Sequence, residues 1–320
     1  MKRKYYLTLD TETATMPFVK YMDLSPKARQ QVAIAKPLVY DIGWCITTTQ
    51  GDVIKKVNYL IQETFFVPQV FNTAYYKNKR PIYMELLKKG EIEVRNWNDA
   101  IEELIADLDF CDMACAYNAC FDYKKAIPFT ERYIKALYSD YYNEWEDMQR
   151  KSAERIAEGI DESENPEYLD PIFQIRGHEF PILDLWGMAC KRLINVNRYK
   201  KFCYENNLFT NSAMYFKTSA ETSFQYLMDN VDFIEDHTAL SDALIESAIL
   251  TKGLKKGKVE PDITAFPFRE LGYTYCNCPK KYIPNVASAF EEYLNKNSNH
   301  PSNAWWTRIE SIYEGLMAYL

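Results

Sequence analysis

The sequence has no apolar run of about 18 residues, so no transmembrane helix is predicted. The amino-terminal stretch MKRKYYLTLDTET is basic at first but continues directly into a strand that ends in acids, which is unlike a secretory signal. No internal repeat or low-complexity segment is visible. With 320 residues and 47% hydrophobic content, we expect a cytoplasmic protein of one or two domains.

The chain also lacks an excess of positive charge, since its net charge is −7 and its calculated pI is 5.3. A protein that grips only a few nucleotides at one end needs little long-range positive field. Three basic clusters are candidate phosphate contacts: KNKR at 77–80, RYKK at 198–201 and KGLKKGK at 252–258. We expect KNKR to be solvated, and the third cluster has the strongest claim because it follows a helix with candidate site residues.

Paired CxxC motifs are absent as well. The eight cysteines lie mostly in apolar patterns, and without an export signal we expect them to be reduced and largely buried. Cys276 and Cys278 form a CxC, but no second cysteine pair or nearby histidine pair accompanies it. A structural zinc site is therefore disfavoured.

The run LTLDTETAT places Asp10 and Glu12 two residues apart at the end of a predicted strand. Side chains at i and i+2 of a strand point to the same side of the sheet. Two neighbouring carboxylates repel each other unless a cation neutralises them. The motif thus indicates a divalent metal site, although a bare DxE more often marks solvated acids at a strand end.

Two further segments strengthen the metal hypothesis. In AYNACFDYKKA, Asn118 follows an apolar strand and Asp122 lies on the first turn of a helix. In EDHTALSDALIESAIL, we expect His237 just before a helix that Thr238 caps, with Asp242 inside it on a mainly apolar stretch. An acid in such surroundings is costly to bury without a partner.

In this order, DxE, NxxxD and HxxxxD resemble the three motifs of the DEDDh 3′–5′ exonucleases, which include proofreading subunits of the DNA polymerase III epsilon type, oligoribonuclease and ribonuclease T. A sister group has YxxxD as its third motif, but here Thr238 stands four residues before Asp242. The stretch ILDLWGMACKRL resembles the strand and helix between the second and third motifs, with Asp184 in a structural place. The resemblance covers residues 3–254.

The resemblance implies an α/β fold: a ribonuclease H-like mixed five-stranded sheet flanked by helices. Asp10, Glu12, Asp122 and Asp242 would hold two divalent metal ions, Mg²⁺ or Mn²⁺, which stabilise the attacking and leaving oxygens of phosphodiester hydrolysis. His237 would be the general base, since its ordinary pKa lies near neutrality. A hydrogen-bonded loop histidine is the structural alternative.

The resemblance also implies the substrate side of the site. The 3′-terminal nucleotide would lie against Thr11, Thr13, Ala14 and Asn118, and nucleoside monophosphates would be released from the 3′ end of nucleic acid. We take single-stranded DNA as favoured over RNA, although no motif encodes recognition of the 2′-hydroxyl. A separate polymerase or replication protein is a possible partner, and no membrane is expected.

The domain prediction is an exonuclease domain over 1–255, with insertions near 14–37, 62–95 and 128–179, and a mostly helical extension over 256–320. Strands are predicted at 4–9, 38–47, 52–61 and 112–117, and a helix at 97–109. Apolar residues from Tyr133 to Met148 predict one amphipathic helix. The acidic stretch 158–171 is predicted to be a surface loop, and Trp305 to Met317 should line one face of a final helix.

Two other function classes stay open. A non-catalytic module that binds nucleic-acid ends would be expected to lack a metal carboxylate, and none is missing. Another ribonuclease H-like nuclease, such as an endonuclease or transposase, fits the HxxxxD spacing less well.

Overall fold

The computed structural model describes residues 4–16, 23–160, 170–263, 273–276, 278–298 and 304–320. Most of the acidic stretch 158–171, and part of the expected insertion 14–37, lie outside these ranges. The chain forms two compact units, 1–185 with 235–264, and 186–234 with 265–320. This division differs from the expected boundary near 255, because residues 186–234 group with the carboxyl-terminal part.

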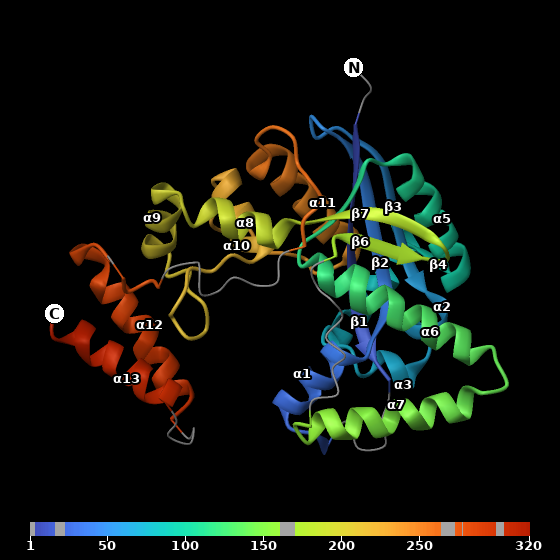
Figure 1. Ribbon diagram of the computed structural model, residues 1–320, viewed down its shortest axis with the longest axis horizontal. Helices are drawn as coiled ribbons and strands as arrows, with labels where there is room; N and C mark the ends of the chain where they lie inside the picture. Colours follow the sequence, from blue (N-terminus) through green and yellow to red (C-terminus); the bar gives the residue numbers. More distant parts are fainter. Residues whose placement is uncertain (1–3, 17–22, 161–169, 264–272, 277, 299–303) are drawn as a thin grey trace. The chain divides into compact units, whose positions relative to one another are not determined.

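The first unit is an α/β domain with a seven-stranded mixed sheet in the order β4-β3-β2-β1-β5-β7-β6 (Figure 1). The predicted α/β class is thus confirmed, but the count of five strands is wrong, because two short strands, β4 and β6, extend the sheet at its edges. The strands are β1 Tyr5–Thr15, β2 Pro37–Thr48, β3 Val53–Ile61, β4 Glu93–Arg95, β5 Met113–Ala116, β6 Ile172–Ile175 and β7 His178–Asp184.

The helices of this unit follow the apolar periodicity of the sequence only in part. The predicted helix at 97–109 is confirmed as α5. The helix expected across 133–148 is instead two helices, because the spacing of apolar residues marks a buried face but not whether the backbone continues as one helix. Just past the end of the first helix, the Ser139 hydroxyl donates to the Ala136 carbonyl. The helices are α1 Pro26–Ala35, α2 Gln62–Phe65, α3 Pro68–Phe71, η2 Lys77–Lys79, α4 Arg80–Lys89, α5 Trp97–Phe110, the π-helix η3 Cys120–Ala126, α6 Ile127–Leu137, α7 Tyr142–Ala157, α11 Ala239–Ala248 and the π-helix η4 Ile249–Leu254.

Strand β2 carries a helix on each side of the sheet. On one face Trp44 Nε1 donates to Asp107 of α5 at 2.8 Å. On the other, Cys45 Sγ lies 3.6 Å from the Ala243 carbonyl of α11. Alternate strand residues face opposite ways, so α5 and α11 cover opposite faces.

Gly43 allows α11 to lie directly on the sheet. A Cβ at this position would be 2.2 Å from the Leu240 backbone nitrogen, which is too close for any other residue without a shift of the helix. The small residues Ala239 and Ala243, both fully buried, lie along the same contact. The sequence of β2 thus fixes how near α11 approaches.

The second unit is mainly helical, with α8 Leu185–Leu193, α9 Asn197–Glu205, α10 Ala220–Met228, η6 Lys280–Tyr282, α12 Ile283–Lys296 and α13 Ala304–Met317. The final helix buries Ile309 and Leu316, whereas Trp305 and Met317 are exposed, so the predicted apolar face is narrower than expected. All eight cysteines are described and none is in a disulfide. Within the described ranges, no helix combines the length and apolar character needed to cross a bilayer.

Candidate metal centre

The two DxE carboxylates of strand β1 project from the face of the sheet that α11 covers. Asp10 pairs with Gly43 and Glu12 with Asp41 in the antiparallel ladder between β1 and β2. Directly opposed residues share a face of the sheet, and this is the face that α11 covers. The strand continues to Thr15, past the predicted end at residue 9, so both acids project from within a strand.

The HxxxxD segment meets the DxE motif at this point. Ligand atoms of Glu12, His237 and Asp242 all lie within 4.8 Å of one another. Asp242 is in the first turn of α11, and His237 directly precedes the N-cap residue Thr238. His237 Nδ1 is 3.7 Å from Asp242 Oδ2 and 3.8 Å from Glu235 Oε2. The structure thus brings together residues more than 220 positions apart in the chain.

Asp10 and Asp122 are not among the residues whose ligand atoms lie within 4.8 Å of one another. Asp122 lies on η3, and its charge repels those of Asp10 and Glu12. The Thr11 hydroxyl donates to Asp122 Oδ1 at 2.6 Å, so this threonine orients a carboxylate from a buried position. Asn118 has a left-handed backbone, with φ of 68°, and its N–H donates to Asp184 Oδ1 at 3.2 Å. Asp184 is buried, and by accepting this hydrogen bond it stabilises the turn after β5, as expected for a structural residue.

Mutual repulsion and burial disfavour the charged forms of these carboxylates. Desolvation, followed by repulsion from Glu246, raises the pKa of Asp10 well above its usual value. Desolvation, followed by repulsion from Asp41, does the same to the pKa of Glu12. Burial raises the pKa of Asp122 to about 7, and burial with repulsion from Glu235 raises that of Asp242 to about 8. A bound cation would reverse these shifts.

One buried oxygen is available to such a cation. Asp242 Oδ1 is buried and has no hydrogen-bond partner among the residues that the structure describes. An unpaired buried carboxylate oxygen is costly, and metal coordination removes the cost. The hard oxygen ligands of Asp and Glu suit Mg²⁺ or Mn²⁺.

Two further acids of the centre belong to none of the three motifs. Glu246 stands one helical turn after Asp242 on α11, is buried, and accepts the Tyr117 N–H at 3.0 Å through Oε2. Asp41 is buried in β2, and its Oδ2 accepts the Ala239 N–H at 3.0 Å. The signal for Asp41 was an isolated acid in an otherwise apolar strand, and the signal for Glu246 was a second acid four residues after Asp242 on a mainly apolar helix.

The side-chain cap of α11 comes from Asp41 and not, as the sequence predicted, from Thr238. Thr238 occupies the N-cap position of α11, but its side chain makes no capping hydrogen bond. The Asp41 carboxylate supplies that bond from β2 instead. A cap from a distant strand leaves no local sequence signature, which is why the Thr was expected to provide it.

The segment that ends in His237 is held by residues of the 62–95 insertion. The Tyr76 ring stacks on the imidazole, with 4.8 Å between centroids and 14° between planes. Lys79 Nζ donates to the Asp236 carbonyl and lies 3.5 Å from the His237 carbonyl oxygen. His237 itself has φ of 50°, a strained backbone for a non-glycine residue. The KNKR cluster, expected to be solvated, therefore includes a residue that fixes the histidine.

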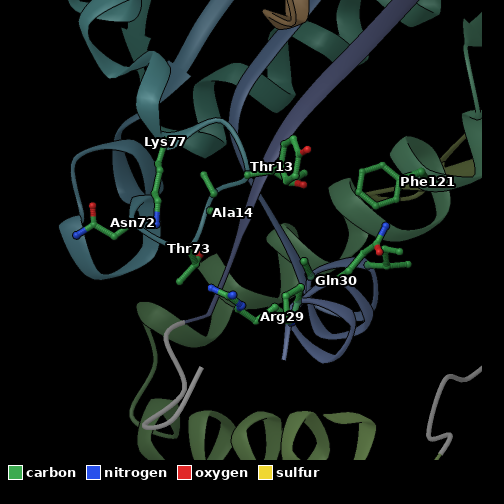
Figure 2. A pocket seen from close by; sticks show the side chains of 13 residues that line it. Thr13, Ala14, Arg29, Gln30, Asn72, Thr73, Lys77 and Phe121 are labelled. Carbon is green, nitrogen blue, oxygen red and sulfur yellow. The ribbon is translucent and has the colours of Figure 1, made fainter. Parts of the chain in front are cut away.

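A pocket of about 550 Å³ opens beside this centre (Figure 2). Thr13 and Ala14, which follow Glu12 on β1, and Phe121, which precedes Asp122, form part of its wall. The remaining wall comes from α1 and from residues 72–77, both in the expected insertions. Of the four residues proposed to contact substrate, Thr13 and Ala14 thus line a cavity, whereas Thr11, which is buried, and Asn118 are not part of its wall.

Comparison with known proteins found no matching family model, no similar curated protein and no similar solved structure.

Proposed function

We propose that this protein is a metal-dependent 3′–5′ exonuclease that hydrolyses the phosphodiester at the 3′ end of nucleic acid. The observation that carries the proposal is the convergence of Glu12, His237 and Asp242 within 4.8 Å. Asp10 lies near this group, because the charges of both Asp122 and Asp242 raise the pKa of its carboxyl. Four carboxylates and one histidine form the set expected from the three motifs.

The fold is compatible with this assignment. Removing the two short edge strands, β4 and β6, leaves β3, β2, β1, β5 and β7, a mixed five-stranded sheet flanked by helices. That arrangement is the one expected for a ribonuclease H-like domain. The candidate site lies on β1, at the centre of these five strands, and on the helices that follow β5 and precede η4.

The residues of the centre fit divalent ions. Asp10, Glu12, Asp122 and Asp242 would hold them, and the Lys79 ammonium lowers the pKa of both Glu12 and Asp242. Bound Mg²⁺ or Mn²⁺ would polarise the phosphoryl oxygens and favour deprotonation of water. The protein's own part is to fix the carboxylates, through the Thr11 hydroxyl on Asp122 and the packing of α11 on Gly43.

His237 would accept a proton from the attacking water. Its Nδ1 lies near the carboxylates of Glu235 and Asp242, which favour the protonated imidazolium that proton transfer creates. Stacking on Tyr76 fixes the plane of the ring. The same geometry offers a second role, because the histidine nitrogen is within ligand distance of Glu12 and Asp242 and could itself bind metal. The kinetics and Mn²⁺ affinity of a His237→Ala variant separate these roles.

A binding module without catalysis is the second candidate function. It would use the same pocket and the same ions but leave the phosphodiester intact. All four motif carboxylates are present in the sequence, and Tyr76 and Lys79 hold His237 beside two of them, Glu12 and Asp242, which favours the enzyme.

The test is digestion of 5′-labelled single-stranded DNA, duplex DNA and short RNA in Mg²⁺ or Mn²⁺. We expect stepwise shortening from the 3′ end with release of mononucleotides, and loss of all cleavage in excess EDTA. Asp10→Ala should remove the activity without unfolding the protein. Full cleavage in EDTA, or internal cuts at the same rate in a circular strand, would contradict the proposal.

A further inference from the structure

The pocket beside the metal centre differs in charge from the rest of the site. Among the residues that the structure describes, its wall includes Arg29 from α1 and Lys77 from η2, and no aspartate or glutamate. This is notable in a chain with 45 acidic and 38 basic residues, next to a cluster of carboxylates. The charge of the pocket selects for an anion.

The two cations are available for a ligand. Among the described residues, neither the Arg29 guanidinium nor the Lys77 ammonium has an ion pair or hydrogen bond. Figure 2 shows Arg29 and Gln30 on one side of the pocket and Asn72 and Lys77 on another, with Thr13 and Ala14 between them. Arginine and lysine side chains so placed are typical phosphate ligands.

The position of the pocket indicates which phosphate group of the substrate would bind there. If the proposed function holds, the scissile phosphate lies at the carboxylates, and the terminal sugar lies against Thr13 and Ala14. Beyond that sugar lie its base, which is uncharged, and its 3′ substituent, which is the part that can carry a phosphate. A volume of about 550 Å³ is within the range of pockets that enclose whole small ligands, so a nucleoside with a second phosphate has room.

We propose that Arg29 and Lys77 bind a phosphate group on the 3′ side of the terminal nucleotide, so that the enzyme processes strands with a 3′-phosphate. This inference rests on the proposed function. Water attacks the scissile phosphorus, the bond from phosphorus to the 3′-oxygen of the preceding nucleotide breaks, and that oxygen takes up a proton. The products are a strand with a 3′-hydroxyl and a nucleoside 3′,5′-bisphosphate.

The phosphate between Arg29 and Lys77 could also be an internucleotide phosphate rather than a terminal one. A strand that continues through the pocket would place its next internucleotide phosphate between the two cations. Product length separates the sources, because a continuing strand releases dinucleotides or longer pieces, whereas a terminal 3′-phosphate leaves as the mononucleoside bisphosphate. The terminal phosphate is favoured, since a volume of about 550 Å³ suits one nucleotide rather than a continuing strand.

Binding tests the pocket without turnover. In Mg²⁺, we expect adenosine 3′,5′-bisphosphate to bind at least tenfold more tightly than adenosine 5′-monophosphate, and the double variant Arg29→Gln, Lys77→Gln to lose that preference. Lys27→Gln is the matched control, because Lys27 is exposed on the same helix and does not line the pocket. Equal affinity of the wild type for the two nucleotides would overturn the inference.

Cleavage separates this inference from the proposed function. Using oligonucleotides that differ only in a 3′-hydroxyl or 3′-phosphate end, we expect the wild type to shorten both, and the double variant to lose at least tenfold in kcat/KM on the 3′-phosphate end relative to the 3′-hydroxyl end. If 3′-hydroxyl strands are shortened and 3′-phosphate strands are not, the exonuclease stands and the phosphate pocket is wrong. If the bisphosphate binds with its preference but no strand is shortened, the pocket stands and the nuclease is wrong.

Discussion

Replacing Asp242 with Asn should stabilise the metal-free protein at alkaline pH. Burial and repulsion from Glu235 raise the pKa of Asp242 to about 8, from 3.8. Between these values the folded protein holds a proton that the unfolded chain has released, so the free energy of unfolding falls as pH rises from about 4 to about 8. One pKa unit corresponds to ~1.4 kcal/mol, which limits the contribution of this carboxylate to ~6 kcal/mol.

Neighbouring carboxylates share this repulsion, so the substitution relieves only part of it. We expect Asp242→Asn to add ~2 kcal/mol to the free energy of unfolding at pH 9, which raises the Tm by roughly 4–8 °C. At pH 5 the wild-type carboxylate is already protonated, and the difference should nearly vanish. Asn has almost the same shape as Asp, so packing in the first turn of α11 is preserved.

The assay is thermal unfolding in EDTA from pH 5 to pH 9, followed by circular dichroism. Asp140→Asn is the control, because Asp140 is exposed and distant in sequence from the three motifs. Saturating Mg²⁺ should raise the Tm of the wild type at pH 8 and have little effect on the variant, since the ion binds only the folded site. Parallel pH profiles for wild type and variant, or a lower Tm of the variant at pH 9, would refute the reasoning.

Two further predictions concern the segments that meet at the centre. If the His237 ring is the general base, His237→Ala should lower kcat by about 10² to 10⁴ with little change in KM, and the rise of rate through the histidine titration range should disappear. Weaker binding of Mn²⁺ by this variant would instead make His237 a metal ligand. An unchanged kcat and pH profile would make it a loop histidine. Gly43→Ala should lower the free energy of unfolding by about 1–3 kcal/mol and reduce activity, because its Cβ would lie 2.2 Å from the Leu240 nitrogen and displace α11. The control is Gly315→Ala, because Gly315 lies on a helix and has open space where a Cβ would be added, so the change should be neutral or slightly stabilising. Equal Tm values for the two alanine variants would disprove the close approach of α11.

The sequence predicted elements wherever local patterning decides structure. The helix over 97–109 and the strands near 38–47 and 52–61 appear nearly as expected, because their apolar residues recur with the period of the element. Local signals were insufficient between α6 and α7, because one apolar stripe continues through the break between the two helices. They also gave no count of the short edge strands, whose three and four residues carry little periodicity.

For the candidate site, the sequence by itself determined the residue types: a pair of acids at alternate strand positions, an acid after an apolar strand, and a histidine five residues before an acid. Only the tertiary structure decided that Glu12, His237 and Asp242 converge within 4.8 Å. It also decided that Asp41 caps α11 from another strand, and that Arg29 and Lys77 line one pocket. These contacts join segments far apart in the chain, so they depend on sheet register and helix packing, which no local pattern of residues encodes.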